Sequence, residues 1–232
     1  MLDLSRFTPF EESIGVSFDD KNLLAQAFTH RSYINEHRMS ALEHNERLEF
    51  LGDAVLELVI TEYLFAKYPT KPEGELTSFR SALVNTSTIS TVATGLGMNE
   101  YLLLSRGESK DTGRARQYIL ANTFESVIGA IYLDQGYAVA KRFIAANLFH
   151  LIEDIVEEGL YRDAKSRFQE QAQEKAAITP NYETLSEEGP DHDKKFTVGV
   201  FLGGEEIARG EGKSKQEAEQ MAARRALEKK GW

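Results

Sequence analysis

The chain has 232 residues, of which 41% are hydrophobic, and a formal net charge of −10, so it is long enough for one large or two modest domains with buried cores. It contains no cysteine, which excludes disulfides, zinc–thiolate sites and thiol catalysis. No apolar run reaches membrane-spanning length, and the first six residues lack the basic start and apolar core of a signal peptide. We therefore expect a cytoplasmic protein without a membrane partner.

Charge is unevenly distributed along the chain. The first 160 residues carry 14 Lys and Arg against 23 Asp and Glu, whereas residues 161–232 carry 13 against 14. The negative balance argues against a simple nucleic-acid coat protein, because such proteins neutralise phosphate with excess positive charge. The balanced second part leaves room for a local basic patch.

The first part of the chain is predicted to be helical. Hydrophobic residues recur at the 3.6-residue period most clearly in the segments Ala41–Lys67, Tyr118–Leu133 and Tyr137–Leu148. Two shorter helices are predicted at Glu73–Leu83 and Ser87–Leu96, the second with Thr86 or Ser87 as its N-cap. No alternating strand pattern precedes residue 180.

The pattern changes after a charged, aperiodic stretch at 153–165. A helix is predicted at 166–175, followed by strands at 182–187, 196–202 and 205–210 and a final helix at 214–230. Gly203 and Gly204 suit a two-residue hairpin turn that needs positive φ, and Ser214 with Glu217 matches a capping box. The sequence thus predicts an all-α domain at 1–155, a linker at 156–163 and a small α+β domain, of order α-β-β-β-α, at 164–231.

Three carboxylates share one face of the longest predicted helix. Glu46, Glu49 and Asp53 are spaced i, i+3 and i+7, which brings them together on an α-helix. Leu48, Leu51 and Val55 recur on the opposite, packed face. Like charges at this spacing destabilise a helix by roughly a few tenths of a kcal/mol per pair, and a hard divalent cation with oxygen ligands would compensate them.

A second helix repeats this arrangement. Asn122 and Glu125 lie at i, i+3 opposite an apolar stripe, and Gly129 follows one turn further along the polar face. A glycine inside a helix costs about 1 kcal/mol relative to alanine and suits a close approach to that face. Two such helices can build an oxygen-rich site for Mg²⁺. The alternative is that these groups form only the solvated sides of amphipathic helices, and the residues alone leave both interpretations open.

Four segments resemble one known family. The stretch Asn45–Leu56, NERLEFLGDAVL, is similar to the signature motif of ribonuclease III, and Phe28–Tyr33, FTHRSY, is similar to the helix-to-loop segment upstream of it. Asn122–Asp134 resembles the second catalytic helix of that family, and residues 163–230 resemble its double-stranded-RNA-binding domain. The resemblance covers nearly the whole chain, in the bacterial two-domain order.

This resemblance implies a helical endonuclease domain that hydrolyses phosphodiester bonds in double-stranded RNA. Glu49, Asp53 and Glu125 would bind Mg²⁺, for which Mn²⁺ can substitute, with Asn122 at the remaining ligand position; Asp53 and Glu125 would be the catalytic residues. The family usually has Asp where this chain has Asn122, so we expect weaker metal binding here. No small-molecule cofactor is implied.

The resemblance also implies residues around this site. It places Glu46 and Glu73 in an outer acidic cluster and Phe50 at the interface of a homodimer, in which each subunit cuts one strand. No exposed apolar seam can be identified from the sequence, so dimerisation is expected from the resemblance alone. Ribosomal-RNA precursors and some messenger RNAs are the expected substrates.

The second domain is expected to contact RNA through three regions, as in the family. Polar side chains share one face of its first helix, namely Ser166, Gln169, Glu170 and Gln173. His192 lies in the loop between the first two strands. Lys213, Ser214 and Lys215 lead into the last helix, where free backbone amides, the helix dipole and two lysines suit phosphate. Such modules recognise the shape of duplex RNA across two successive minor grooves.

Two other functions remain open from the sequence. The chain could be a duplex-RNA-binding protein whose nuclease domain is a weakly active or inactive dimer scaffold, an interpretation that Asn122 alone supports. It could also be an acidic helical protein-interaction module with an appended RNA domain. Cleavage of duplex RNA with and without EDTA separates the first of these from a metal-dependent nuclease, and the second predicts no gain in thermal stability from Mg²⁺ or Mn²⁺.

Overall fold

The computed structural model describes residues 2–37, 42–157, 164–190 and 194–232. The chain forms two compact units, Met1–Tyr161 and Arg162–Trp232, and each is described by itself. This division agrees with an all-helical first part and a mixed second part. The exact limits of the predicted linker stay a prediction, because residues 158–163 lie outside the described residues. The last helix of the first unit continues to Glu157, two residues into the segment predicted as linker.

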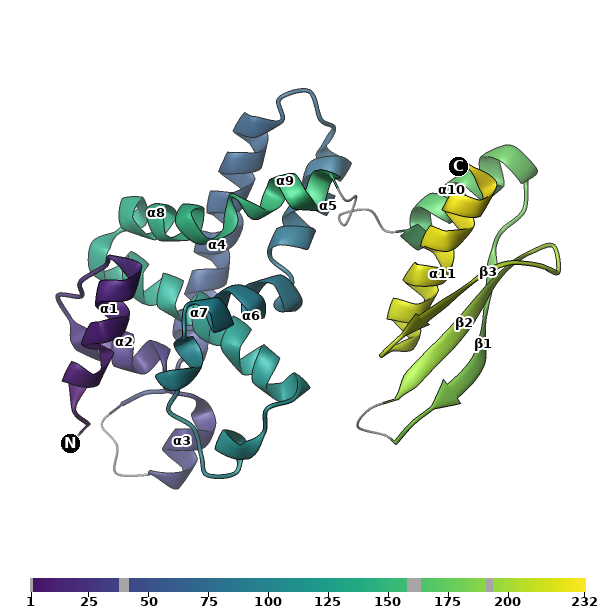
Figure 1. Ribbon diagram of the computed structural model, residues 1–232. Coiled ribbons are helices and arrows are strands. Elements are labelled where there is room, and N and C mark those ends of the chain that lie inside the picture. The colour runs from purple at the N-terminus through teal and green to yellow at the C-terminus, as the bar shows by residue number, and fades with distance from the viewer. Residues whose placement is uncertain (1, 38–41, 158–163, 191–193) are drawn as a thin grey trace. The chain divides into compact units, whose positions relative to one another are not determined.

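The described part of the first unit is built from helices alone (Figure 1). Its α-helices are α1 (Thr8–Ile14), α2 (Lys21–Ala27), α3 (Arg31–Glu36), α4 (Glu46–Lys67), α5 (Glu73–Leu83), α6 (Thr86–Gly95), α7 (Arg114–Gln135), α8 (Tyr137–Leu148) and α9 (Leu151–Glu157). Short 3-10 turns lie at η1 (Leu4–Phe7), η2 (Met98–Glu100) and η3 (Glu108–Lys110). The predicted bounds of α5 and α8 are confirmed, but α6 is capped by Asn85 rather than by Thr86 or Ser87.

Helices α4 and α7 cross with their backbones in contact. A Cβ atom at Gly52 would lie 1.7 Å from the carbonyl oxygen of Glu125, and one at Gly129 would lie 2.2 Å from that of Leu48. Only glycine permits this approach, since any side chain would overlap the neighbouring backbone. The close approach predicted for Gly129 is therefore made by α4 itself, and it brings the acidic residues of both helices to one place.

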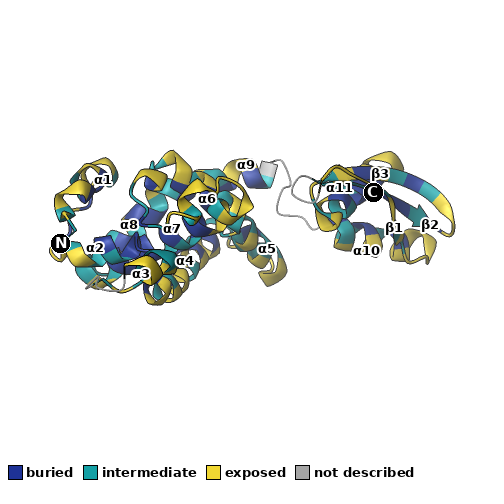
Figure 2. Ribbon diagram, turned by 90° about the horizontal axis from the view of Figure 1, so that it is seen from below, coloured by how far each residue is buried: buried dark blue, intermediate teal, exposed yellow. Residues whose placement is uncertain are grey.

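Core packing on the other faces of α7 keeps the two helices in this arrangement. The helix α7 is the most deeply buried element, with buried residues on nearly its whole circumference (Figure 2). Phe124, Val127, Ile128 and Ile131, which were predicted to face away from the acidic site, have no exposed surface. Asn122 and Glu125 are thus carried by a helix that cannot rotate without breaking the core.

Asn45 ties the start of α4 to two other segments. It is 3% exposed, its backbone N–H donates to the Thr29 carbonyl (2.9 Å) and its amide donates to the Ala27 carbonyl (3.2 Å). Its own carbonyl accepts from the hydroxyl of Ser126 on α7 (3.3 Å). Because buried polar groups are costly when unpaired, these bonds fix where the first turn of α4 begins.

The second unit has the predicted α-β-β-β-α order. Its elements are α10 (Ala164–Ala176), β1 (Asn181–Glu188), β2 (Lys195–Leu202), β3 (Glu205–Gly212) and α11 (Lys215–Lys230). The strands form an antiparallel sheet in sequence order, and both helices pack on one face of it (Figure 1). Ala222 and Ala226 of α11 are fully buried there together with Val200.

A glycine turn and a bulge in β1 contribute to the register of the sheet. Gly203 and Gly204 have φ of 57° and 91°, which confirms the predicted hairpin turn between β2 and β3. In β1 the pairing shifts between Thr184 and Ser186, so Leu185 is an extra residue of a β-bulge. Beyond the bulge, Glu187 lies opposite Phe196 of β2.

Replacing Gly52 by alanine tests whether the helix crossing holds the first unit together. The added methyl group has no room beside the Glu125 carbonyl, so we expect a loss of about 3 kcal/mol in the free energy of unfolding, measured by urea denaturation. The matched control is Gly95→Ala at the end of α6, where no atom lies within 4 Å of the added carbon. This control should be neutral or stabilising by up to about 1 kcal/mol; equal effects of the two substitutions would contradict the packing argument.

Candidate metal centre and nucleic-acid interface

The crossing of α4 and α7 gathers four of the predicted site residues. Glu49 and Asp53 come from α4, and Asn122 and Glu125 come from α7. The Asn122 amide donates a hydrogen bond to the Glu49 carboxylate, and the charges of Glu49 and Asp53 both act on Glu125. The structure therefore places these four side chains near one another, and their role as metal ligands stays a prediction.

The cluster carries more negative charge than its surroundings compensate. Burial, together with the charges of Asp53 and Glu49, raises the pKa of Glu125 to about 8. The pKa of Glu49 is raised as well, chiefly by burial and by the charge of Glu46, and the hydrogen bond from Asn122 opposes this rise. Two carboxyl groups that resist ionisation beside a third indicate a place where a cation would be bound favourably.

The donor set fits a hard divalent cation by its chemistry. All four side chains offer oxygen atoms, which Mg²⁺ prefers over nitrogen or sulfur. Among the described residues, no group of three or more His, Asp or Glu side chains already stands close enough to hold a metal ion. The side chains of this cluster would therefore have to draw closer around an ion, and the Asn122 amide would complete the ligand set.

Two other acidic residues were predicted to lie around this cluster. Glu46 is on its edge, where its carboxylate lies 3.6 Å from Arg31 and 3.7 Å from the His44 ring. Glu73, at the start of α5, instead accepts a hydrogen bond from the Thr77 hydroxyl (3.2 Å). The charge of Glu46 raises the pKa of Glu49. The charge of Glu73 is not among those that shift the pKa of Glu49 or Glu125. Within this chain Glu46 thus adjoins the site, whereas no interaction among the described residues joins Glu73 to it.

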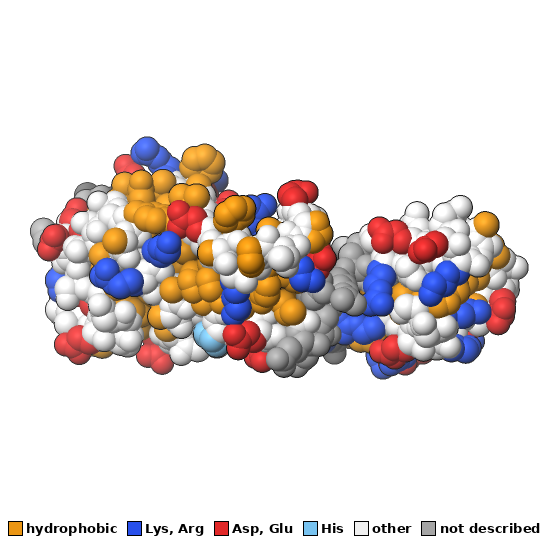
Figure 3. All heavy atoms as spheres, turned by 90° about the horizontal axis from the view of Figure 1, so that it is seen from above, with side chains coloured by type: hydrophobic (Ala, Val, Ile, Leu, Met, Phe, Trp, Pro, Cys, Tyr) orange, Lys and Arg blue, Asp and Glu red, His pale blue; other side chains and the backbone are white. Residues whose placement is uncertain are grey.

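An exposed apolar stripe runs along α4, and sequence reasoning missed most of it. Phe50 is 83% exposed, Phe65 74% and Leu58 52%. At 100° per residue these positions fall within about 80° of one another on the helix. Apolar side chains also gather on the face of the first unit drawn in Figure 3. Apolar residues of α4 extend from the packed face round to positions beside the acidic face, so the sequence pattern could not separate this stripe from the core face.

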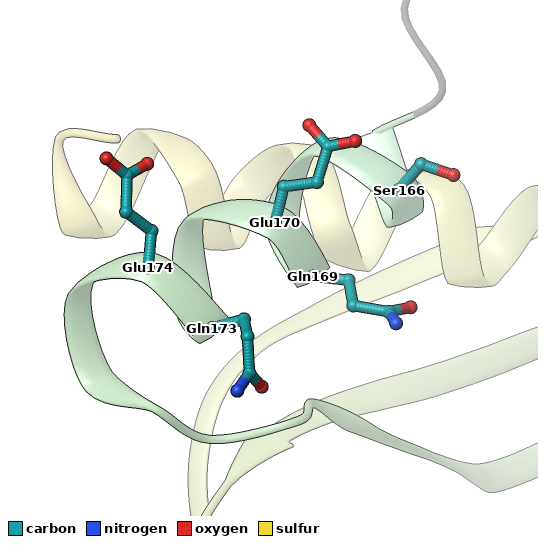
Figure 4. Close-up of a pocket in the computed structure, with 5 residues that line it drawn as sticks. All are labelled: Ser166, Gln169, Glu170, Gln173 and Glu174. Carbon is teal, nitrogen blue, oxygen red and sulfur yellow. The ribbon is translucent and has the colours of Figure 1, made fainter.

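Four of the predicted RNA-contacting residues share one surface of the second unit. Ser166, Gln169, Glu170 and Gln173 line an open hollow of about 650 Å³ along α10, together with Glu174 (Figure 4). In this view Glu170 and Glu174 point to one side of the helix, whereas Gln169 and Gln173 point to the other. Amide and hydroxyl groups of this kind can bond the 2′-hydroxyls of RNA.

The start of α11 differs from the prediction in one respect. Ser214 is the N-cap, and its hydroxyl accepts from the N–H of Glu217 (3.2 Å). The Glu217 carboxylate accepts from the N–H of Lys213 (2.8 Å) instead of that of Ser214. The capping box is thus shifted by one residue, and the prediction of free backbone amides here is wrong for two of them. The side chains of Lys213 and Lys215 remain the predicted phosphate contacts at this end.

Two histidines considered from the sequence are His192 and His30. His192, predicted to contact RNA, lies outside the described residues. His30 caps α3, where its Nδ1 atom lies 2.8 Å from the Ser32 hydroxyl. Burial lowers the pKa of His30, which favours the neutral ring that such a cap requires.

Comparison with known proteins places this architecture in a family. The family model described as Ribonuclease-III-like matches residues 20–152, and the one described as the double-stranded RNA binding motif matches residues 164–230. The chain belongs to the ribonuclease III family.

Full-length relatives agree with this assignment. The chain is 46% identical over 227 residues to "Ribonuclease 3" of Geobacillus thermodenitrificans, covering 97% of this chain and 91% of that protein. It is 45% identical over 229 residues to "Ribonuclease 3" of Enterococcus faecalis, covering 97% and 98%.

A solved structure matches the first unit. The nuclease domain of ribonuclease III from Campylobacter jejuni is 41% identical and superposes with a TM-score of 0.55, covering 61% of this chain and 97% of that one. None of the helices in the described part of the chain combines the length and hydropathy needed for a membrane span.

The raised pKa of Glu125 predicts how the metal-free protein responds to pH. The folded state keeps a proton up to a pKa of about 8, whereas the unfolded chain releases it near 4.5. The free energy of unfolding should therefore fall as pH rises through this window. Glu125→Gln removes this loss, which we expect to be about 2 kcal/mol after allowance for solvent screening.

Urea denaturation in EDTA at a series of pH values measures this difference. Glu12→Gln on α1, which replaces an exposed carboxylate, is the control and should follow the wild-type curve. A Glu125→Gln curve that runs parallel to the wild-type curve would show that Glu125 is not held protonated.

Proposed function

We propose that this chain is a Mg²⁺-dependent endoribonuclease that hydrolyses phosphodiester bonds in double-stranded RNA. Its membership of the ribonuclease III family and its double-stranded RNA binding motif support the substrate and the reaction. The observation that carries the proposal is the convergence of Glu49, Asp53 and Glu125 at the glycine crossing of α4 and α7.

Each residue of the cluster has a proposed role. Glu49, Asp53, Glu125 and Asn122 would hold the Mg²⁺, and Mn²⁺ would substitute for it. When held by these residues, the cation would lower the pKa of a water molecule and neutralise charge on the leaving oxygen. Asp53 and Glu125 are the proposed catalytic residues, and neither needs to act as the nucleophile. Asn122 orients the Glu49 carboxylate through its amide hydrogen bond, but contributes no charge.

The second unit would hold the duplex. Ser166, Gln169, Glu170 and Gln173 present polar groups along the open hollow on α10, which suits contact with a minor groove. Lys213 and Lys215 would bind phosphates, with Ser214 fixing the start of the helix that carries Lys215. His192 is proposed to contact the neighbouring groove.

A homodimer is proposed for the first unit. Phe50, Leu58 and Phe65 form an exposed apolar stripe that a second copy would cover, and a two-fold arrangement pairs the same surface of both subunits. The Campylobacter jejuni structure is described as showing flexibility in a region involved in dimer formation of the nuclease domain. Each of the two sites would cut one strand, with Glu46 and Glu73 in an outer acidic cluster. Ribosomal-RNA precursors and some messenger RNAs are the proposed substrates, and the cytoplasm is the proposed location.

Two opposite substitutions at the cluster test the proposed activity. Purified protein is incubated with a long RNA duplex over a Mg²⁺ titration, and cleavage is followed on gels. Glu125→Ala removes a ligand and should lower the cleavage rate by at least about 100-fold. Asn122→Asp adds a negative charge and should reach the wild-type rate at a lower Mg²⁺ concentration.

EDTA and single-stranded RNA of the same sequence are the negative controls, and Glu12→Gln should behave as wild type. Cleavage in EDTA would refute the metal requirement. Normal cleavage by Glu125→Ala would refute the assignment of this cluster as the active site. Duplex binding without cleavage at any Mg²⁺ concentration would favour the inactive dimer scaffold instead.

Charging the apolar stripe tests the dimer. Phe50→Glu places a carboxylate where the partner would bury an aromatic ring, so we expect the mass measured by sedimentation at micromolar concentration to fall from that of a dimer to that of a monomer. Leu185→Glu, at an exposed apolar residue of the second unit, is the matched control and should leave the dimer intact. A monomeric wild-type protein, or a Phe50→Glu dimer, would refute this interface.

A further inference from the structure

One of the two lysines proposed to bind phosphate, Lys215, already forms an ion pair with a carboxylate. The ammonium group of Lys215 lies 2.6 Å from an oxygen of Glu187 and 5.7 Å from the centre of the Phe196 ring. Glu187 and Phe196 face each other across β1 and β2, so their side chains project on the same side of the sheet. The Lys215 side chain thus extends from the start of α11 to contact β1 and β2 of the sheet.

The Glu187 carboxylate is an anion of the same chain that lies close to two lysines. It is also 4.0 Å from the ammonium group of Lys194, and the hydrogen bond from Lys215 lowers its pKa, so it is ionised at neutral pH. Among the described residues, by contrast, the Lys213 side chain forms no ion pair with a carboxylate. Figure 3 shows this mixture of charges on the second unit, where Asp and Glu side chains lie among Lys and Arg.

We propose that Glu187 competes with RNA phosphate for Lys215 and thereby limits the affinity of this protein for duplex RNA. The inference rests on the proposed function, because it takes Lys215 as a phosphate contact. A phosphate that approaches Lys215 meets a carboxylate within hydrogen-bond distance of the same ammonium group, and the two anions repel each other. Lys215 must therefore leave Glu187 or bind phosphate against this repulsion.

The exposure of the pair sets the size of the effect. Lys215 is 56% exposed and Glu187 38%, and ion pairs between groups of this exposure are weak. Removing the carboxylate should consequently raise affinity by about two- to fivefold. It should also make the dependence of affinity on salt steeper, by less than the roughly 0.9 logarithmic units that one full phosphate contact contributes.

Fluorescence anisotropy of the full chain with a labelled RNA duplex tests this competition. Binding is measured in EDTA over about 50 to 200 mM KCl, and gels confirm that the duplex stays intact. Glu187→Gln should tighten binding two- to fivefold at the lowest salt, and this gain should shrink as salt increases. Thermal unfolding confirms that each variant is folded.

The matched control is Glu206→Gln. Glu206 is a partly exposed carboxylate in a strand of the same unit and is paired with Arg209 at 2.6 Å, so the substitution makes the same change in net charge. It should tighten binding much less than Glu187→Gln. If both substitutions raised the affinity equally, the effect would come from the change in net charge alone, and the proposal would be overturned.

A double-substitution cycle identifies Lys215 as the group that is released. Lys215→Gln should weaken binding more in the Glu187→Gln protein than in the wild type, because only there is Lys215 fully available to phosphate. If Glu187→Gln weakens binding, Glu187 orients Lys215 instead of competing for it, and the proposal is wrong.

The same cycle separates this inference from the proposed function. If Lys215→Gln weakens binding while Glu187→Gln has no effect, competition is refuted and the RNA contact stands. If Lys215→Gln leaves binding unchanged in both backgrounds, the phosphate contact of Lys215 and the competition both fail, and cleavage of duplex RNA by the first unit is still tested by Glu125→Ala.

Discussion

The contact between the backbones of α4 and α7 is the constraint on which the candidate active site depends. Helices that carry side chains at their crossing point stand about 8 to 10 Å apart, whereas Gly52 and Gly129 let these two approach until a single methyl group would overlap a carbonyl oxygen. This approach allows Glu49 and Asp53 on one helix to act on Glu125 on the other. The two glycines thus belong to the site as much as the carboxylates do.

Bringing carboxylates together lowers the stability of the fold, and contacts in the surrounding structure offset this loss. The core around α7 is fully buried on the side opposite the acidic residues, and Asn45 joins the start of α4 to α7 and to the segment before α3. The first unit is therefore rigid where its charges repel. Preorganisation of this kind would let a cation bind without a large rearrangement of the helices, although individual side chains would have to draw closer around it.

Much of this structure could be predicted from the sequence, because the relevant signals are local. The spacing of Glu46, Glu49 and Asp53 placed them on one helix face, and the two adjacent glycines at 203–204 identified the hairpin turn. The arrangement between helices could not be predicted from spacing. The role of Gly52 depends on which backbone it meets, and the exposure of Phe65 depends on which sides of α4 are covered by neighbours.

The capping of α11 shows the same limit on a smaller scale. Ser214 and Glu217 stand at capping-box spacing, and the hydroxyl makes the expected bond, yet the carboxylate turns to the N–H of Lys213. The choice between two neighbouring amides depends on how the chain enters the helix from β3. The motif predicts that the helix starts here, but it does not predict which donors remain for a ligand.

The single extra residue in β1 decides on which side of the sheet a charge is placed. Side chains alternate between the two faces of a strand, so one inserted residue exchanges the faces for everything that follows. Because Leu185 is that insertion, Glu187 projects toward α11; in a regular strand it would lie on the opposite surface, far from any lysine of that helix. A change in strand length of one residue would therefore be enough for evolution to move an anion onto or away from the side of the sheet that carries α11.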